Sequence, residues 1–322
     1  MLKLSKVSFS YDREPVLQNI SLKISEGQNI SVIGESGCGK STLLKLIYGL
    51  LHTDGKITWK DRELKGPNFN LVPGEPFIKY LAQDFDLMLP LTAAENVGKF
   101  LSNFFPIKKK RRIKELLEVV EMEDVANKKA KFLSGGQQQR IALARALADE
   151  PEILLLDEPF SHIDHFRKNN LRRRLFSYLK EKNITCIIAT HDSTDAMSFA
   201  DRTLVIKNAG IYADGSPEQL YNNPPNQYVA SLFGDVNHLM HKNISADSES
   251  RKRVVLYPHE IGVNRNSKFK ASVKNCYFKG ESYLIEANLN GERILLEHPE
   301  SLKLGTKIGI SVSEKLIQKR FT

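Results

Sequence analysis

A glycine-rich segment near the N-terminus combines residue types that bind phosphate. It consists of Gly34, Glu35, Ser36, Gly37, Cys38, Gly39, Lys40, Ser41 and Thr42. An apolar run ends just before it, and a helical pattern begins just after it. Glycines at this spacing let successive backbone N–H groups line one concave surface. The segment therefore predicts a phosphate-binding loop (P-loop) with Lys40 on the β- and γ-phosphates and Ser41 on Mg²⁺; a glycine turn without a ligand is the alternative.

Two acidic residues follow a short apolar run in the middle of the chain. Residues 153–156 are Ile-Leu-Leu-Leu, and Asp157 and Glu158 come directly after them. A continuous apolar run of this length is typical of a buried parallel strand, and parallel sheets bind ligands at the carboxyl ends of their strands. We predict that Asp157 binds Mg²⁺ and that Glu158 polarises the water that attacks the phosphate. The alternative is that both acids only cap the strand or form salt bridges.

A second apolar run, residues 185–190, leads directly to His191. If this run is a strand of the same sheet, His191 lies at the same edge as the two acids. A histidine there could contact the terminal phosphate or the attacking water, whereas an isolated histidine is more often a hydrogen-bonded part of the fold. We interpret His191 as a member of the site.

Ser134, Gly135, Gly136 and Gln137 precede strong helix formers at residues 141–148. A serine followed three positions later by a glutamine fits the capping box that begins many helices. Because the first N–H groups of a helix are unpaired and the positive end of its dipole lies there, this segment predicts a second anion-facing helix start. A helix cap without a ligand is the alternative.

Hydrophobic patterns predict the elements that position these residues. Apolar residues alternate through residues 2–24, which predicts antiparallel strands, and helical patterns dominate from about 86 to 150. Short alternating segments typical of a small β-barrel follow at residues 254–260, 283–287, 294–296 and 308–312. We therefore predict an α/β fold: a P-loop NTPase core with an antiparallel β subdomain and a helical subdomain, followed by a small all-β barrel domain.

The predicted boundary between the two domains falls at residues 235 and 236. The nucleotide-binding domain is then residues 1–235, and the barrel domain is residues 236–322. The polar residues 243–250 are predicted to be a flexible stretch.

Composition narrows the class of protein. The chain has 322 residues, of which 41% are hydrophobic and 26% charged, and it contains no run of the roughly 18–20 apolar residues that a transmembrane helix needs. Its N-terminus lacks the apolar segment of a secretory signal, so we expect a cytosolic protein. Cys38, Cys186 and Cys276 are far apart and odd in number, which indicates reduced thiols.

The charge balance is basic. A net charge of +9 is compatible with a nucleic acid, an anionic lipid surface or only an anionic nucleotide as partner. The densest basic run is residues 108–112, which we interpret as the solvated start of a helix. Charge alone does not choose among these partners.

The motifs together resemble a known family. Residues 133–137, Leu-Ser-Gly-Gly-Gln, joined in order and spacing to the P-loop, to the two acids and to His191, closely resemble the nucleotide-binding subunit of ABC transporters over residues 1 to about 235. The resemblance implies that Tyr11 stacks on adenine and that Gln83 belongs to the Mg²⁺-sensing loop that also meets the membrane partner. It makes His191 the switch histidine. Residues 161–164 match the D-loop, with His162 where alanine is commoner.

The resemblance also implies an assembly. Two copies of the chain would sandwich two ATP molecules, with the P-loop of one copy facing the Leu-Ser-Gly-Gly-Gln segment of the other. The partners would be integral membrane permease subunits, reached from the inner face of the cell membrane, and indirectly an extracytoplasmic solute-binding protein. The implied cofactors are ATP and Mg²⁺.

The C-terminal part narrows the branch of the family. Residues 201–234 resemble the end of the importer ATPases for ferric iron, polyamines, sulfate and maltose, and the predicted barrel resembles their TOBE domain. An inorganic ion such as ferric iron, or a polyamine, is the favoured solute. An exporter ATPase, or an ABC protein acting on ribosomes or DNA, is the alternative. A single cassette without a coiled-coil insert argues against the latter, so no nucleic acid partner is expected.

Overall fold

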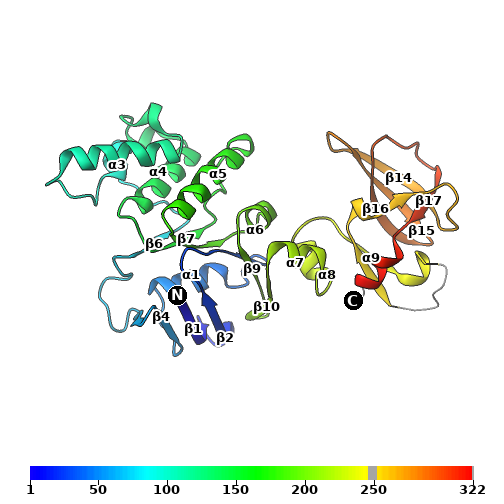
Figure 1. The fold of residues 1–322 in the computed structure, drawn as a ribbon, viewed down its shortest axis with the longest axis horizontal. Helices are drawn as coiled ribbons and strands as arrows, with labels where there is room; N and C mark the ends of the chain where they lie inside the picture. Colours follow the sequence, from blue (N-terminus) through cyan, green and yellow to red (C-terminus); the bar gives the residue numbers. More distant parts are fainter. Residues whose placement is uncertain (246–251, 321–322) are drawn as a thin grey trace. The chain divides into compact units, whose positions relative to one another are not determined.

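The computed structural model describes residues 1–245 and 252–320. It divides the chain into two compact units, Met1–Pro217 and Glu218–Thr322, which are coloured blue to green and yellow to red in Figure 1. Within the described residues, no helix is both long and apolar enough to cross a membrane.

The first unit opens with a four-stranded antiparallel sheet in the order β2-β1-β4-β5. Its strands are β1 (Leu2–Ser10), β2 (Pro15–Ile24), β4 (Lys56–Trp59) and β5 (Arg62–Glu63). Alternate side chains such as Leu2, Leu4 and Val7 are buried on one face because successive residues of a strand point to opposite sides. The predicted antiparallel strands are confirmed.

A six-stranded sheet forms the centre of this unit, in the order β10-β9-β3-β8-β7-β6. Its strands are β3 (Asn29–Ile33), β6 (Ile78–Leu81), β7 (Ile153–Asp157), β8 (Thr185–Ala189), β9 (Arg202–Lys207) and β10 (Gly210–Gly215). The five strands from β9 to β6 are parallel, and β10 is antiparallel to β9. Every residue of β3, β7 and β8 is buried, which explains why apolar residues predominate in these strands.

The central sheet is covered on both faces. Ile153 and Leu155 of β7 pack into a core with α1 (Lys40–Tyr48) and the N-terminal sheet, whereas Leu154 and Leu156 pack into a core with the helices of the other face. Figure 1 shows α3, α4 and α5 on one side of β6 and β7, with α1 and the N-terminal sheet on the other. Alternation along one buried strand thus builds two cores.

The helical layer contains α2 (Ala93–Val97), α3 (Pro106–Val119), α4 (Gly135–Leu147) and α5 (His165–Glu181), with the short helical turns η1 (Glu123–Val125) and η2 (Ala130–Phe132). Helix α6 (Ser193–Ser198) follows β8. Thr92 and Glu95 form a capping box that fixes the start of α2. The helices α2 to α4 lie within the predicted helical subdomain, residues 86–150.

The second unit is mainly antiparallel β-structure. Strands β13 (Gly262–Val263), β17 (Lys307–Ser311), β14 (Lys270–Phe278), β15 (Tyr283–Leu289) and β16 (Glu292–His298) form a curled five-stranded half-barrel in that order. Strands β11 (Asn237–Met240) and β12 (Arg253–Leu256) form a separate antiparallel pair. The remaining elements are α7 (Pro217–Asn222), α8 (Gln227–Ser231), η3 (His241–Asn243), η4 (Pro258–Glu260) and α9 (Glu314–Lys319).

The contacts divide the chain earlier than the predicted boundary at residues 235 and 236. The rings of Tyr221 and Tyr257 stack with centroids 4.3 Å apart, and Ala230 is buried in the same cluster. Helices α7 and α8 therefore pack with the β-structure of the second unit. This tertiary packing left no periodic signal in the sequence.

The predicted flexible stretch 243–250 is wrong for its first three residues. Asn243, Ile244 and Ser245 are buried. The Asn243 amide donates to Glu292 Oε2 (2.7 Å), and the Ser245 hydroxyl donates to Glu314 Oε1 (2.7 Å). Polar residues can be buried where such partners satisfy them. Residues 246–250 lie outside the described part of the chain.

Candidate active site

Sheet topology brings the predicted groups to one edge. Strands β3, β8, β7 and β6 are parallel neighbours, so their carboxyl ends meet at the same edge. Ala189 pairs in register with both Val32 and Asp157, which places the P-loop, His191 and the two acids at one level. Gln83 comes two residues after the end of β6 at the same edge. This is where parallel sheets bind their ligands.

The P-loop needs glycine at two positions for different reasons. Gly39, which caps the start of α1, has φ 103°, in the left-handed region that residues with a Cβ avoid. At Gly34 a Cβ would lie 2.4 Å from the carbonyl oxygen of Ile206, so the backbone of β9 approaches too closely for any side chain. Turn and packing together fix the shape that presents the N–H groups.

Lys40 lies inside the loop that it serves. Its ammonium donates to the carbonyl oxygens of Gly34 and Glu35, both at 2.9 Å, and the side chain is buried. A positive charge is therefore held within the concave surface of the loop. Burial raises the pKa of the Cys38 thiol, an effect that the neighbouring Lys40 only partly offsets. Cys38 is a protonated spacer in the loop, and all three cysteines are free thiols.

Asp157 joins two elements at the strand end. Its Oδ1 accepts from the Ser41 hydroxyl (2.9 Å), and its Oδ2 accepts from the Tyr80 hydroxyl (3.1 Å). Burial, together with the Asp157 carboxylate, raises the pKa of Tyr80, which keeps that hydroxyl a donor. Tyr80 was missed by sequence reasoning because a tyrosine within a strand is usually part of the core.

The Ser41–Asp157 pair fits a magnesium ion. A hydroxyl and a carboxylate 2.9 Å apart are hard oxygen donors. Mg²⁺ is usually held by one or two such groups, with substrate phosphates and waters completing its shell. Among the described residues there is no group of three or more His, Cys, Asp or Glu side chains that could hold a metal by itself.

Glu158 and His191 form a direct contact. His191 Nδ1 lies 2.7 Å from Glu158 Oε2, with the carboxylate largely enclosed and the imidazole exposed. Glu158 has φ 51°, an unusual conformation for a residue with a side chain. Its backbone is fixed on both sides: its N–H donates to the Ala189 carbonyl, and its own carbonyl accepts from Gln139 Nε2 (3.0 Å). This backbone directs the carboxylate toward the histidine.

The start of α4 has the predicted capping box. The Ser134 hydroxyl accepts from the Gln137 N–H (3.3 Å), and the Gln137 side chain accepts from the Ser134 N–H (3.0 Å). A Cβ on Gly136 would lie 2.6 Å from the carbonyl oxygen of His162, so the D-loop packs directly on this glycine. A Cβ on Gly135 would meet nothing within 4 Å. One glycine is required by packing, and the other faces open space.

The unusual D-loop residue His162 links two loops. Its ring packs edge-on against Phe85, with centroids 5.3 Å apart, and its Nδ1 lies 3.0 Å from the Ser161 hydroxyl. Phe85 lies two residues after Gln83. The side chain at position 162 therefore connects the D-loop to the loop that carries Gln83.

Two residues that were predicted to belong to the site, Tyr11 and Gln83, are exposed to solvent. Tyr11 follows β1 and is 60% exposed, and its ring packs edge-on against Phe9 with centroids 4.9 Å apart. Gln83 is also exposed. The adenine-stacking and sensing roles given to these two residues stay predictions.

A buried ion-pair network behind His191 was missed by sequence reasoning. Arg172 on α5 lies 2.6 Å from the Asp192 carboxylate and 2.6 Å from the Asp195 carboxylate. Thr190 donates to Asp195 (2.7 Å) and accepts from the Asp192 N–H (3.0 Å). Burial raises the pKa of Asp195 to about 6 against the opposing effects of Thr190 and Arg172. The network fixes the backbone on both sides of His191.

We expect Arg172→Ala to lower the free energy of unfolding by about 3–5 kcal/mol, because it leaves two carboxylates without their cation. Urea denaturation followed by circular dichroism measures this. Arg173→Ala is the matched control, since Arg173 is the exposed neighbour on the same helix, and it should change stability by less than about 0.5 kcal/mol. Equal losses in the two variants would contradict a structural role for the network.

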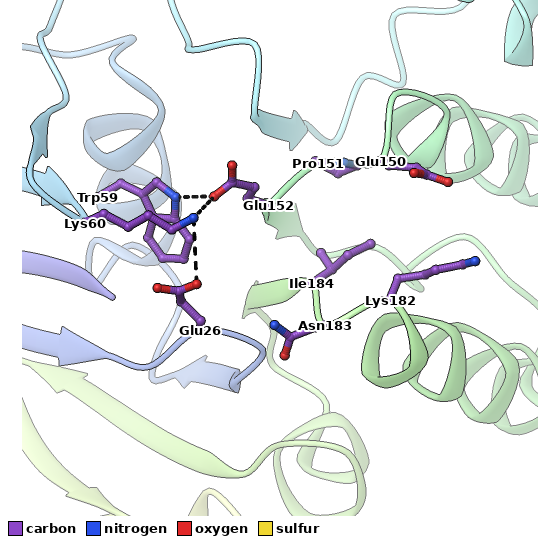
Figure 2. Close-up of a pocket in the computed structure, with 9 residues that line it drawn as sticks. All are labelled: Glu26, Trp59, Lys60, Glu150, Pro151, Glu152, Lys182, Asn183 and Ile184. Carbon is purple, nitrogen blue, oxygen red and sulfur yellow. Dashed lines mark hydrogen bonds and ion pairs between the residues drawn. The ribbon is translucent and has the colours of Figure 1, made fainter.

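A pocket of about 280 Å³ lies at the opposite end of β7 and is separate from this site (Figure 2). Glu152, which precedes β7, accepts there from Trp59 Nε1 (2.6 Å) and from Lys60 Nζ (2.8 Å). Lys60 also pairs with Glu26 (3.8 Å). These groups satisfy one another, so we assign the pocket to the packing of the N-terminal sheet against the core.

Comparison with known proteins agrees with this geometry. Residues 17–161 match the family model described as ABC transporter. The chain is 31% identical over 340 residues to the spermidine/putrescine import ATP-binding protein PotA of Clostridioides difficile (strain 630), covering 97% of this chain and 95% of that one. It is 32% identical over 329 residues to the sulfate/thiosulfate import ATP-binding protein CysA of Pseudomonas syringae pv. tomato (strain ATCC BAA-871 / DC3000), covering 99% and 97%. It is 30% identical over 342 residues to the Fe(3+) ions import ATP-binding protein FbpC of Haemophilus influenzae (strain 86-028NP), covering 98% and 97%.

Solved structures show the same cassette. The dimeric post-hydrolysis state of the ATP-binding cassette MJ0796, bound to ADP and Pi, superposes with a TM-score of 0.60 at 31% identity, covering 67% of this chain and 99% of that one. The cbiO1 protein of Clostridium perfringens, part of the ABC transporter complex cbiONQ, superposes with a TM-score of 0.61 at 27% identity, covering 68% and 90%. The chain belongs to the ABC transporter family and is an ATPase of the import ATP-binding subunit type.

Proposed function

We propose that this chain hydrolyses ATP as one half of a two-copy site and so powers the import of a solute through a separate membrane permease. The observation that carries the proposal is the joint placement of Lys40, the Ser41–Asp157 pair and the Glu158–His191 pair at one sheet edge. These groups supply a cation for phosphate, ligands for a metal and a base beside a histidine. That set matches the needs of phosphoryl transfer to water.

Each group has a distinct task in hydrolysis. The N–H groups of the P-loop and the Lys40 ammonium bind the β- and γ-phosphates of ATP. Ser41 and Asp157 would hold Mg²⁺, which would neutralise charge on the phosphates. Glu158 orients the attacking water and takes a proton from it as the water oxygen forms a bond to the γ-phosphorus. The bond from that phosphorus to the β,γ-bridging oxygen breaks, and ADP and phosphate leave.

His191 orients the Glu158 carboxylate. Its Nδ1 contacts one carboxylate oxygen at 2.7 Å, which leaves the other oxygen for water. Because the imidazole is exposed, its Nε2 is accessible to the γ-phosphate or to a group from a second copy. The Arg172 network holds the backbone on which His191 stands. Movement of that backbone would therefore change the geometry of the base.

Gly135 supports the contribution of a second copy. In one chain the start of α4 packs on its own D-loop through Gly136, while Gly135 faces open space. The open N–H groups of a 13-residue helix suit the γ-phosphate held by the P-loop of a partner copy. The dimeric state of the structural neighbour bound to ADP and Pi is in keeping with this arrangement.

The two neighbouring glycines allow a matched test of the two-copy site. We expect Gly135→Ala to leave stability unchanged and to weaken both ATP-dependent dimerisation and turnover by roughly tenfold or more, because the new methyl group stands where the partner's phosphate would approach. Gly136→Ala should instead lower the free energy of unfolding by about 1–3 kcal/mol through its clash with His162. Sedimentation with ATP and urea denaturation separate the two effects. Full ATP-dependent dimerisation of Gly135→Ala would contradict the assignment.

The permease is expected to bind the helical layer. A groove of about 650 Å³ lies beside α3. Its lining combines apolar residues, among them Ile107, Ile113 and Leu117, with the basic residues Lys110, Arg111 and Lys114. A groove of this kind accepts an amphipathic helix. Gln83 follows β6, which lies at the edge of the sheet that this layer covers. Contact with a permease helix in the groove would then reach the site through the loop of Gln83.

The solute class is proposed from the relatives. The proteins named above are import subunits for spermidine and putrescine, for sulfate and thiosulfate, and for Fe(3+) ions. For this chain we favour an inorganic ion such as ferric iron, or a polyamine. We also propose that the C-terminal half-barrel corresponds to the TOBE domain of such importers. Residues 257–260, Tyr-Pro-His-Glu, differ from the Arg-Pro-Glu common there, which leaves a regulatory role unassigned.

Reconstitution tests the proposal directly. The chain is copurified with its permease subunits, placed in vesicles with ATP available to the cassette, and assayed for uptake of ferric iron, other inorganic ions and polyamines. Import that requires ATP and fails with Glu158→Gln supports the proposal. ATP-dependent efflux would favour the exporter alternative. Salt-sensitive nucleic acid binding near 10⁻⁸ M or tighter would favour a role outside transport.

A further inference from the structure

An exposed apolar and basic surface lies where α3 begins. Its apolar members are Phe100, Phe104 and Phe105, and its basic members are Lys99 and Lys108; we call this surface the α3 tip. It is distinct from the groove beside α3, which Ile107, Lys110 and Arg111 line. Phe104 is 91% exposed and Phe105 is 60% exposed. Figure 1 shows α3 at the outer side of the helical layer of its unit. Large apolar side chains gathered in the open mark a surface with a partner.

The charge of this part of the chain has one sign. Between Glu95 and Glu115 the sequence contains seven lysines and arginines and no acidic residue. Two of the seven serve the fold: Lys109 donates to the Leu101 carbonyl (3.2 Å), and Arg112 donates to the carbonyls of Leu147 (2.7 Å) and Ala148 (3.2 Å). The other five are exposed. The packing of α3 therefore does not account for most of this charge.

The stability of helix α3 does not account for these lysines either. The first turn of α3 contains no acidic residue, and residues 108–112 continue it with five cations. Cations near the amino end of a helix oppose its dipole. Their placement is unfavourable for the isolated unit and becomes favourable against a surface of negative charge.

We propose that the α3 tip binds the surface of an anionic lipid bilayer. The three phenylalanines would enter the interfacial region, and Lys99 and Lys108 would contact the negative headgroups. Aromatic side chains concentrate at that depth, and basic clusters beside them are the usual means by which a protein recognises anionic lipid. The side chains of the α3 tip protrude from a loop and from the start of a helix. Protruding side chains can insert into a soft surface such as a bilayer, whereas the groove beside α3 cannot. This contact requires neither ATP hydrolysis nor a permease.

Vesicle binding by the full-length chain tests the proposal. Vesicles of phosphatidylcholine with about 30 mol% phosphatidylglycerol should sediment the protein at least tenfold better than vesicles of phosphatidylcholine alone, and added salt should weaken the binding. Equal binding to both vesicles, or none to either, overturns the proposal.

A matched pair of double variants locates the contact. Lys108 lies over the ring of Phe105 at 5.2 Å, and Lys65 lies over the ring of Phe69, an exposed residue of the N-terminal half, at 5.3 Å. K108E/F105S and K65E/F69S thus make the same changes in charge and apolar surface at two places. Only K108E/F105S should lose binding, by roughly tenfold or more. Equal loss in both variants would show that net charge alone drives binding and overturns the proposal.

A fluorescent reporter at the α3 tip shows whether the tip inserts into the bilayer. The only tryptophan of the chain, Trp59, is buried, so Phe104→Trp adds a second emitter at the tip. Its emission should shift to the blue when phosphatidylglycerol vesicles are added, and that of Phe69→Trp should not.

Tighter binding of wild-type protein to polyuridylate than to the vesicles overturns the proposal in favour of nucleic acid. If K108E/F105S binds vesicles normally but no longer copurifies with the permease, the tip is a protein contact and the proposal is likewise overturned.

Discussion

Replacing Glu158 by glutamine is expected to reduce ATP turnover by roughly 10²- to 10⁴-fold while ATP binding is retained. The change removes a negative charge and leaves the size of the side chain almost unaltered. Glutamine cannot take a proton from water, whereas the P-loop and the Ser41–Asp157 pair are untouched. Bound ATP should therefore persist and hold two copies together. Turnover is measured by phosphate release, and the dimer by sedimentation with ATP.

The matched control for this variant lies on the same strand. Glu152 precedes β7 and Glu158 follows it, and Glu152 is occupied by Trp59 and Lys60 far from the phosphate edge (Figure 2). Glu152→Gln should change turnover by less than about twofold, because surface ion pairs contribute little. Near-normal turnover in Glu158→Gln would remove this residue from the role of base.

Replacing Lys40 by alanine is expected to weaken ATP binding by about 10- to 150-fold and to abolish measurable hydrolysis. The range follows from the roughly 1.5–3 kcal/mol contributed by a hydrogen bond to a charged group. Lys40 holds its ammonium inside the P-loop through Gly34 and Glu35, so the variant removes both the cation for phosphate and an internal brace of the loop. Binding is measured with a fluorescent ATP analogue, and hydrolysis by phosphate release.

A conservative variant distinguishes the two contributions of Lys40, its positive charge and its hydrogen bonds within the P-loop. Lys40→Arg keeps a cation but places a wider guanidinium in a loop whose carbonyls accept an ammonium at 2.9 Å. It should bind ATP better than Lys40→Ala does and remain poor at hydrolysis. A fully active Lys40→Ala would exclude the P-loop from the mechanism.

The variants Lys40→Ala and Glu158→Gln are expected to affect different steps of the reaction, namely ATP binding and the attack of water. In the proposed mechanism, Lys40 contributes to binding the phosphates and is needed before any chemistry. In the same mechanism, Glu158 contributes only when water attacks. A loss of ATP affinity in Lys40→Ala together with retained affinity in Glu158→Gln would establish that division.

Local sequence was sufficient wherever function depends on a short motif. The P-loop, the capping box at Ser134 and the acids after residues 153–156 each carry their own geometry, because loop shape, helix caps and buried strands follow from a few adjacent residues. Alternating patterns likewise predicted the N-terminal sheet. Strand β14 was not predicted, since its polar residues and the register shift between Val273 and Asn275 break the alternation.

Tertiary structure alone decided which residues meet. No pattern links Arg172 to Asp195, or Tyr80 to Asp157, because each pair joins elements separated along the chain and brought together by packing. The boundary between the units depended on Tyr221 stacking with Tyr257 in the same way. The sequence by itself determined the chemistry at the edge of the sheet. The fold determined how those groups are held, and which side chains of α3 remain in the open.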